Sequence, residues 1–356
     1  MIKSFGYAAN NPFLGLHPHE FEREEPGADD VVIDILYCGV CHSDVHQVKN
    51  EWKNTVYPCL PGHEIVGRVL STGAAVTKFK AGDLVGVGCM IDSCAECAAC
   101  KEGLEQYCEG PHSWTATYNG PMKPDGSNTF GGYSTNIVVK EHFVLRVPET
   151  LDTKAVAPLL CAGITTYSPL KHWKVSAGQK VGVVGLGGLG HMAVQLAKAM
   201  GAHVTVFTTS KEKEADAKRL GAENVVISTD KKAMAEQESQ FDFILNTIPE
   251  KHDVNPYVQC LKRDATIVLV GVLAPMEPVN NMQVAFYRRS VAGSLIGGIA
   301  ETQEVLDFCA EHNIVSDIEL IPIDEINKAY KRIEKGDVKF RFVIDGASLK
   351  SEAAKA

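Results

Sequence analysis

Short apolar runs alternate with helical repeats through the middle of the chain. The run Val181–Val184 predicts a buried strand, and Gly201 stands where the C-cap of the following helix belongs. The apolar face of that helix is formed by Met192, Leu196, Ala199 and Met200. Further strands are predicted at 203–208, 224–228, 241–246 and 265–271, and helices near 211–220, 230–238 and 253–262. Repeated strand–helix units predict a doubly wound parallel sheet, so the fold class is α/β.

The first 150 residues show a different pattern. Short strands with closely spaced turn signals are predicted at 33–38, 65–70 and 84–87. The character changes after Pro148, where helical spacing runs from Leu151 to Leu170. A strand at 291–296, a helix near 301–312 and a mixed tail follow the repeated units. A chain of 356 residues with two such patterns predicts two domains, each with its own core.

Composition and charge narrow the range of partners. The hydrophobic content of 45% and the 31 glycines fit a globular α/β protein, and a net charge of −9 without a basic run argues against nucleic acid and anionic membranes. No apolar stretch approaches the ~18 residues needed to span a bilayer, and the N-terminal residues lack a signal-peptide core. We therefore expect a cytoplasmic protein whose 11 cysteines are ligands and core residues rather than disulfides.

A glycine-rich turn follows the first strand of the repeated units. Gly185, Gly187 and Gly190 have the spacing G-x-G-x-x-G, with a predicted strand before them and a helix after them. Such a turn lets a pyrophosphate approach the backbone N–H groups at a helix N-terminus. The alternative is a tight turn that binds nothing. We expect the dinucleotide to contact the whole turn, which comprises Gly185, Leu186, Gly187, Gly188, Leu189 and Gly190.

The end of the next strand bears on the choice between NAD and NADP. An acidic residue about 20 positions after the glycines would bind the ribose hydroxyls of NAD. Here the stretch Phe207–Lys213 offers hydroxyls and two lysines instead, although Glu212 lies just beyond the strand. We therefore predict NADP. The expected contacts of its phosphate are Thr209, Ser210 and Lys213, and Thr208 and Lys211 are further expected cofactor contacts. The alternative for Ser210 is a helix cap.

Four cysteines lie close together in a loop that runs from Cys94 to about Thr129. Cys94, Cys97, Cys100 and Cys108 have the spacing C-x2-C-x2-C-x7-C, in a segment rich in Gly, Pro, Ser and Asn. Four thiolates so close together match a closed tetrahedral zinc site, and the metal would supply the folding energy of a loop with little apolar content. An iron–sulfur cluster and unliganded thiols are the competing interpretations.

A second group of metal-capable residues is scattered. A catalytic zinc needs three protein ligands and one open position. The residues available for it are Cys38, Cys41, His42, His46, His63, Glu64 and Cys161. Spacing alone does not choose among them, because Cys38 could be a core residue and His63 a satisfied buried histidine.

Several motifs together resemble those of one known family. They are C-G-V-C-H-S-D-x-H from Cys38, P-G-H-E-x-x-G from Pro61, the four-cysteine loop, C-A-G-I-T-T from Cys161, G-L-G-G-L-G from Gly185, and the tail Arg341–Asp345. In this order they resemble the zinc-dependent medium-chain alcohol dehydrogenases, in the branch of the cinnamyl alcohol dehydrogenases. Within that branch the chain most resembles bacterial NADPH-dependent aldehyde reductases.

The resemblance implies a domain organisation and a ligand set. Residues 1–153 and 296–356 would form a mostly β, GroES-like catalytic domain, and residues 154–295 a Rossmann domain. The catalytic zinc ligands would be Cys41, His63 and Cys161. Glu64 would lie beside that metal, and Asp44 would hold the ligating histidine, although Asp44 could also cap a helix.

The same resemblance implies roles for further residues. Ser43 and His46 would relay the proton, although they could instead be a helix cap and a surface imidazole. His42 and Arg341 would contact the pyrophosphate, or be ordinary surface charges. The nicotinamide half of the cofactor would be lined by Thr165, Thr247, Gly271, Ser294 and Ile296. An apolar substrate pocket would draw on Trp52, Trp114, Tyr118 and Leu295.

The function expected from these features is reversible hydride transfer between NADPH and an aldehyde, with two zinc ions per subunit and broad specificity for aromatic and aliphatic aldehydes. A zinc-independent quinone or enone reductase on the same fold is one alternative, and a non-catalytic nucleotide- and zinc-binding redox sensor is another. We expect a homodimer in which the strand Val291–Ile296 extends the sheet, although an edge strand can also be covered within one chain.

Overall fold

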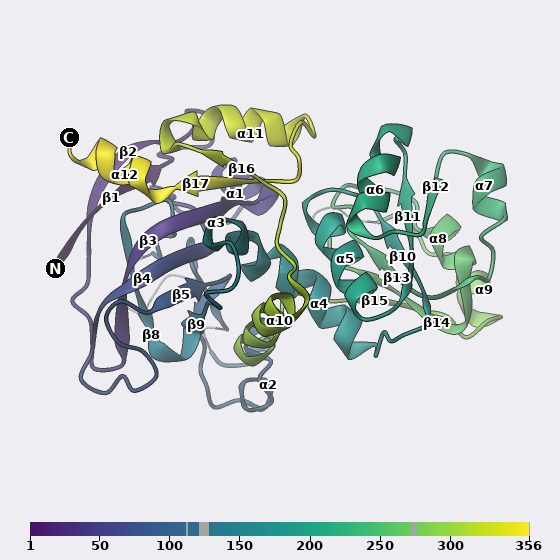
Figure 1. Cartoon of the computed structure of the whole chain (residues 1–356), viewed down its shortest axis with the longest axis horizontal. Helices are drawn as coiled ribbons and strands as arrows, with labels where there is room; N and C mark the ends of the chain where they lie inside the picture. The colour runs from purple at the N-terminus through teal and green to yellow at the C-terminus, as the bar shows by residue number, and fades with distance from the viewer. Residues whose placement is uncertain (112, 121–127, 272–275, 356) are drawn as a thin grey trace. The chain divides into compact units, whose positions relative to one another are not determined.

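The structure is a computed structural model that describes residues 1–111, 113–120, 128–271 and 276–355. The chain divides into two compact units, Met1–Cys161 with Gly297–Ala356, and Ala162–Ile296 (Figure 1). The first boundary follows Cys161 and therefore lies later in the chain than the expected residue 153. Among the described helices, none is both long enough and apolar enough to cross a bilayer.

The unit Ala162–Ile296 contains the predicted doubly wound sheet. Its strands are β10 (Lys180–Val184), β11 (His203–Thr208), β12 (Asn224–Ile227), β13 (Phe241–Asn246), β14 (Leu261–Leu269) and β15 (Ser290–Gly293). They lie in the order β12-β11-β10-β13-β14-β15, and every neighbouring pair is parallel. The chain order therefore reverses direction at β10, the strand that leads into the glycine-rich turn. This is the topology of a Rossmann fold, so the predicted fold class is confirmed.

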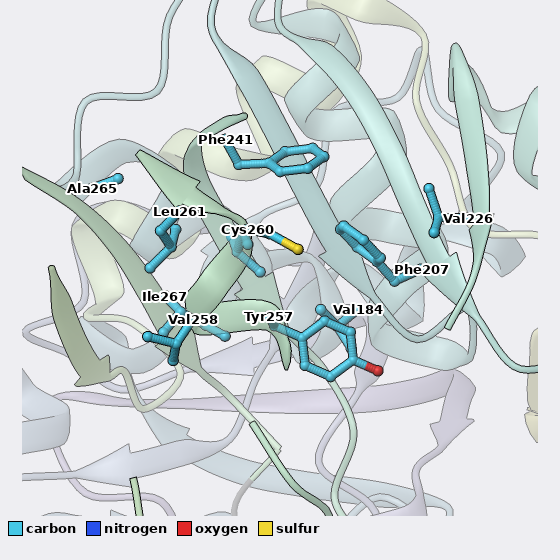
Figure 2. Packing of buried hydrophobic residues seen from close by; sticks show 11 residues of the cluster. Val184, Phe207, Val226, Phe241, Tyr257, Val258, Cys260, Leu261, Ala265 and Ile267 are labelled. Carbon is cyan, nitrogen blue, oxygen red and sulfur yellow. The ribbon is translucent and has the colours of Figure 1, made fainter. Parts of the chain in front are cut away.

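The helices of this unit connect its parallel strands. They are α4 (Ala162–His172), α5 (Gly188–Ala199), α6 (Glu214–Leu220), α7 (Lys231–Ala235), α8 (Asn255–Cys260) and α9 (Asn281–Ala285). Figure 2 shows part of the core, where side chains of α8 pack against those of the strands. The Phe207 ring lies edge-on to Phe241 and Tyr257, with centroids 5.3 and 5.5 Å away. A Cβ at Gly182 would come within 2.9 Å of Phe207, so this ring requires glycine in the middle of β10.

The other unit is built on a mostly antiparallel sheet. Its order is β16-β17-β3-β4-β5-β9, with β8 also paired to β3. These strands are β3 (Asp30–Val40), β4 (Ile65–Thr72), β5 (Leu84–Val87), β8 (Asn136–Lys140), β9 (Leu145–Arg146), β16 (Ile318–Ile321) and β17 (Arg341–Asp345). Two further pairs are β1 (Ile2–Ala8) with β2 (His17–Arg23), and β6 (Met90–Asp92) with β7 (Thr115–Ala116). The helices are α1 (His42–Val48), α2 (Ala98–Lys101), α3 (Thr153–Val156), α10 (Ile299–His312), α11 (Ile326–Glu334) and α12 (Gly346–Ala353).

Three elements differ from the sequence prediction. The stretch Leu151–Leu170 was expected to be continuously helical, but it is α3, a 3-10 turn at Ala157–Leu160 and then α4. Pro158 at the second position of that turn lacks a backbone N–H, and Cys161 leaves the helical region with φ −129° and ψ −67°. Two strands were misplaced at their ends, because β14 already begins at Leu261 and β15 already ends at Gly293.

Candidate active site

Three strand ends meet at one edge of the antiparallel sheet. Strand β3 runs antiparallel to both β4 and β17, so its C-terminal end lies beside their N-terminal ends. Cys41 follows the last residue of β3, Glu64 precedes the first residue of β4, and Arg341 is the first residue of β17. A hydrogen bond from Gly39 N to Glu64 O, at 2.9 Å, closes this edge. Residues far apart in the sequence are thereby brought together.

The broken helix brings in a second thiol. Cys161 stands between the 3-10 turn and α4, and its Sγ lies 4.0 Å from the Sγ of Cys41. The hydrogen bond between the two thiols is the largest cause that lowers the pKa of Cys41 well below its ordinary value. Cys41 is therefore suited to be a thiolate, which is the form that binds a metal.

Four buried donors surround this point. One ligand atom from each of Cys41, His63, Glu64 and Cys161 lies within 4.8 Å of the others, and all four side chains are buried. Both carboxylate oxygens of Glu64 lack a hydrogen-bond partner among the described residues. Burial raises the pKa of Glu64 to about 7, against the opposing charge of Arg341. Two thiols, an imidazole and an unsatisfied carboxylate fit a buried divalent cation, and this donor set matches catalytic zinc.

Arg341 lies inside this cluster rather than on the surface. Its side chain is 6% exposed, and its Nη1 is 3.5 Å from Oε1 of Glu64. The charges of Glu64, Cys41 and Cys161 raise the pKa of Arg341, although its burial, the largest contribution, acts in the opposite direction. The structure thus places a permanent positive charge beside the donors. The burial of Arg341 beside Glu64 could not be predicted from the sequence of the C-terminal strand alone.

Asp44 orients the histidine of the cluster. Its Oδ1 lies 3.0 Å from Nδ1 of His63, which leaves Nε2 of the ring for a metal. Burial alone would lower the pKa of His63, but the Asp44 charge and hydrogen bond raise it well above its ordinary value. Asp44 Oδ2 also accepts from Cys41 N at 2.8 Å and so caps α1. The two interpretations of this aspartate from sequence, one that it holds the histidine and the other that it caps a helix, are therefore compatible.

The residues expected to carry the proton lie on α1, the helix that begins after Cys41. Ser43 Oγ is 3.6 Å from the thiol of Cys41. The ring of His46 stacks on His42 with centroids 4.4 Å apart, and its Nδ1 pairs with the carboxylate of Glu51. Glu51 was missed from the sequence. The available signal was an acidic residue five positions after His46, in the turn that follows α1.

The four-cysteine loop forms a second donor cluster. The ligand atoms of Cys94, Cys97, Cys100 and Cys108 lie within 4.8 Å of one another. Hydrogen bonds from the backbone N–H groups of Cys100 and Glu109 lower the pKa of Cys97 to about 6. Backbone N–H groups also point at the sulfurs of Cys94 and Cys108. Four converging sulfurs with backbone donors match a structural zinc site.

The glycine-rich turn in the other unit has room for a phosphate. Gly185 has φ +91°, and a Cβ at Gly190 would lie 2.1 Å from the carbonyl oxygen of Gly185. Both positions therefore require glycine. Nothing lies within 4 Å of a Cβ built at Gly187, the residue that caps α5. The turn is therefore tightly packed at Gly185 and Gly190, and it has open space at Gly187, where a ligand would approach. Leu186, Gly188 and Leu189 complete it.

The stretch after β11 lies near the same turn. Lys213 Nζ donates to the carbonyl of Leu186 at 3.2 Å, which brings a lysine to the glycine-rich turn. The side chain of Ser210 makes no capping hydrogen bond, although Ser210 precedes the 3-10 turn Lys211–Lys213. Ser210 therefore occupies the cap position without a capping hydrogen bond from its hydroxyl. The lysines and hydroxyls of 208–213 are consistent with binding of a phosphate.

The remaining predicted residues are divided between the two units. Trp52, Trp114 and Tyr118 belong to the unit that carries the donors. The Trp52 ring lies 5.9 Å from His46, and the buried Tyr118 ring lies 5.8 Å from His63. The dinucleotide unit contains Thr165, Thr247, Gly271, Ser294, Leu295 and Ile296. Part of the expected pocket loop, residues 121–127, lies outside the described residues.

Comparisons with known proteins point to one family. Residues 27–149 match the family model of the alcohol dehydrogenase GroES-like domain, and residues 188–311 match that of zinc-binding dehydrogenases. The chain is 56% identical to the aldehyde reductase YahK of Escherichia coli, over 98% of this chain and 99% of that protein. It is 51% identical to the NADP-dependent alcohol dehydrogenase C 1 of Mycolicibacterium smegmatis, over 97% of this chain and 98% of that protein.

Solved structures agree with this assignment. The cinnamyl alcohol dehydrogenase SbCAD4 of Sorghum bicolor has a TM-score of 0.93 and 44% identity, over 97% of this chain and 98% of that one. A cinnamyl alcohol dehydrogenase of Helicobacter pylori, solved with NADP(H), has a TM-score of 0.90 and 44% identity, over 97% of this chain and 99% of that one. The chain therefore belongs to the zinc-dependent medium-chain alcohol dehydrogenases, in the branch of the cinnamyl alcohol dehydrogenases.

Proposed function

We propose that this chain reduces aldehydes with NADPH and oxidises the corresponding alcohols in reverse. The observation that carries the proposal is the buried set Cys41, His63, Glu64 and Cys161, in a chain that belongs to the alcohol dehydrogenases. A zinc ion held by Cys41, His63 and Cys161 would supply Lewis-acid polarisation of the carbonyl group. The four-cysteine loop would hold a second, structural zinc. A zinc-independent reductase would not need the first donor set.

The chain's own residues would move the proton. Ser43 has its hydroxyl beside Cys41, so it is placed to donate a proton near the donor set. His46 lies one helical turn further along α1, and its contact with the partly exposed Glu51 would connect Ser43 to solvent, from which the proton comes in aldehyde reduction and to which it goes in alcohol oxidation. We therefore extend the relay expected from sequence by one residue, in the order Ser43, His46 and Glu51.

NADPH is the proposed coenzyme. The open turn at Gly187 would receive the pyrophosphate at the N-terminus of α5. Lys213 and the hydroxyl of Ser210, which makes no capping hydrogen bond, would bind the additional phosphate of NADP. Thr208, Thr209 and Lys211 would contribute to the same site. One relative is named as NADP-dependent and another was solved with NADP(H), which supports the same choice.

The substrate side is proposed to be apolar and aromatic. Trp52 and Tyr118 lie beside the two histidines of the site, and they would contact the substrate together with Trp114 and Leu295. Aromatic walls favour broad acceptance of aromatic and aliphatic aldehydes. We further propose a cytoplasmic homodimer. A reducing compartment keeps the thiols of both clusters available, and all 11 cysteines are free.

The test is the initial rate of NADPH oxidation with benzaldehyde, run beside NADH at equal concentration on zinc-replete protein. A fast rate with NADPH and a much slower one with NADH is the expected result. Comparable rates with both coenzymes would keep the reaction but discard the roles of Ser210 and Lys213. Absence of any rate with either coenzyme, over a panel of aromatic and aliphatic aldehydes, would contradict the proposed function.

A further inference from the structure

Each carboxylate oxygen of Asp44 accepts two hydrogen bonds beside the donor cluster. Its Oδ1 accepts from Nδ1 of His63 at 3.0 Å and from Gly62 N at 3.3 Å. Its Oδ2 accepts from Cys41 N at 2.8 Å and from the hydroxyl of Tyr133 at 3.1 Å. Asp44 has no exposed surface. Two of these donors belong to proposed zinc ligands, and Tyr133 supplies the one hydroxyl among the four. The hydroxyl of Tyr118 also interacts with Asp44.

Tyr133 also belongs to a segment that is bonded to the chain just before His63. Gly131 N donates to Leu60 O at 2.8 Å, Gly132 N to Gly62 O at 2.9 Å, and Tyr133 N to Pro61 O at 2.9 Å. Three consecutive backbone hydrogen bonds thus tie 131–133 to 60–62. The next residue along this second segment is His63.

The close approach of the two segments depends on glycine. A Cβ at Gly131 would lie 2.3 Å from the carbonyl oxygen of Gly62, and a Cβ at Gly62 would lie 2.7 Å from the ring of Tyr133. Gly62 also has φ +106°, which other residues rarely adopt. The backbone contact therefore fixes where the tyrosine ring lies, and its hydroxyl reaches Asp44 from that position.

The hydroxyl of Tyr133 is a permanent donor. The side chain has no exposed surface, and its burial raises the pKa of Tyr133 well above the ordinary value, with the Asp44 charge as the next cause. A tyrosine that stays protonated can only donate to a carboxylate. A donor on one oxygen of Asp44 restrains the rotation of the carboxylate, and with it the contacts to Cys41 and His63.

We propose that Tyr133 is a positioning residue for the zinc site, which holds the imidazole of His63 and the backbone of Cys41 in place by donating to Asp44. The inference rests on the proposed zinc set. It gives the segment Gly131–Tyr133 a role that neither the sequence motifs nor the donor geometry alone had assigned. Tyr133 does not reach the substrate through these contacts, so its effect would pass through the metal ligands.

The test is the zinc affinity of Tyr133→Phe, which removes one hydroxyl and keeps the ring. Tyr330→Phe is the matched control, because Tyr330 is also buried and also feels the Asp44 charge, but its hydroxyl interacts with that of Tyr133 and not with Asp44. Zinc content per chain is followed by elemental analysis during competition with a chelator of known affinity. Melting temperatures of both zinc-free variants provide the measure of general destabilisation.

We expect Tyr133→Phe to lower the zinc affinity of the site formed by Cys41, His63 and Cys161 by about tenfold. This is the lower end of the effect seen when a hydrogen-bond partner of metal ligands is removed. The zinc of the four-cysteine loop should keep its affinity, as should both zinc ions in Tyr330→Phe. In combination with Asp44→Asn the loss should not add, because both changes act through the Asp44 carboxylate.

Two outcomes separate the inference from the proposed function. A wild-type protein that binds one zinc per chain would overturn the zinc set itself. A wild-type protein with two zinc ions, and a Tyr133→Phe variant with unchanged affinity for both, would overturn the role of Tyr133 alone. Equal weakening in Tyr133→Phe and Tyr330→Phe would likewise overturn it, because loss of any nearby hydroxyl would then have the same effect.

Discussion

Two cysteines three positions apart have opposite environments. Cys38 lies within β3, paired between Ile65 and Ile344, and burial raises its pKa well above the ordinary value. Cys41 follows the end of the strand, where Cys161 lowers its pKa. The ligand atom of Cys41 lies within 4.8 Å of those of His63, Glu64 and Cys161, and Cys38 does not belong to this cluster. The position relative to the end of β3 therefore separates a core residue from a ligand.

The first prediction concerns this pair. Cys161→Ser should reduce the zinc content from two ions per chain to one and abolish turnover, because it removes one ligand of the open site. Cys38→Ala is the matched control; it should keep both ions and lose only about 1 kcal/mol of stability from the removed buried atom. Elemental analysis and thermal melts measure both effects. Full activity in Cys161→Ser would contradict the ligand assignment.

The second prediction concerns the relay on α1. His46→Ala should lower kcat for alcohol oxidation by about 10²-fold, the lower end of general acid–base effects, with little change in zinc content. Glu51→Gln should have a smaller effect in the same direction, because an amide cannot take the proton from His46. Steady-state rates across pH 6–10, at several buffer concentrations, measure both. If His46→Ala matched wild type at low buffer concentration, the proton would leave by another route.

Residues of the site differ in how far the sequence revealed them. Cys41, His63 and Cys161 were expected only because their motifs resembled a family, and spacing alone left seven residues open. Glu51 and Tyr133 were not expected. Each acts through a partner brought near by folding, Tyr133 through a backbone pairing between 60–62 and 131–133. Contacts of that kind leave no periodic pattern in the sequence.

At the scale of elements, the parallel strands were predictable and the interruptions were not. Buried strands give unbroken apolar runs, so the strand cores at β10, β11 and β13 were located correctly. The break between α3 and α4 was missed because the apolar spacing continues across it. Pro158 was its only local signal, and a proline at the start of a turn is also compatible with a helix.

One buried carboxylate joins two elements far apart in the chain. Glu105, just after α2, is 3% exposed; its Oε2 accepts from Ile299 N at 3.1 Å, the first N–H of α10. Its Oε1 contacts Nε2 of His142 at 2.9 Å. Burial would raise the pKa of Glu105, but the hydrogen bond to His142 and those from backbone N–H groups lower it overall. The cysteine-rich loop thus caps the helix that begins the C-terminal segment.

The third prediction is the pH dependence of this link. Glu105→Gln should lower the free energy of unfolding by about 1 kcal/mol near pH 7, as expected for loss of a charged cap. Because the folded pKa is depressed, the stabilisation is present above the unfolded pKa of about 4.3 and is lost as pH falls through the folded value. Urea melts at pH 7, 5 and 3.5 should therefore show the unfolding free energies of wild type and Glu105→Gln converging as the pH falls. A constant difference across this range would show that the charge of Glu105 contributes nothing.

At the scale of the whole molecule, the two units have separate tasks. One carries both donor clusters, and the other carries the glycine-rich turn and the basic stretch after β11. The alternation of strands and helices was enough to predict the doubly wound parallel sheet of the second unit, whereas the strand order came from the structure. The antiparallel unit was expected only as short strands, since pairings such as β3 with β17 join residues about 300 positions apart and no local pattern encodes them.

The proposed dimer is the last prediction. In the described part of the dinucleotide unit, β15 pairs with β14 on one side and forms an edge of the sheet. Shortly before it in the sequence, Met282, Phe286 and Tyr287 are apolar residues that are 59, 76 and 42% exposed. A second copy of the chain could cover both features at once, by pairing its own β15 across a twofold axis.

Phe286→Asp tests this surface, and Phe13→Asp is the control, since Phe13 is 90% exposed on the other unit. Burial of one phenylalanine is worth about 1.5–3 kcal/mol, and a twofold interface buries two, so the dissociation constant should rise by about 10²-fold or more. Sedimentation over a range of concentrations should then find Phe286→Asp largely monomeric where wild type and Phe13→Asp are dimeric. A Phe286→Asp variant as dimeric as the control would place the interface elsewhere, because a buried carboxylate at a twofold axis would have to face its own copy.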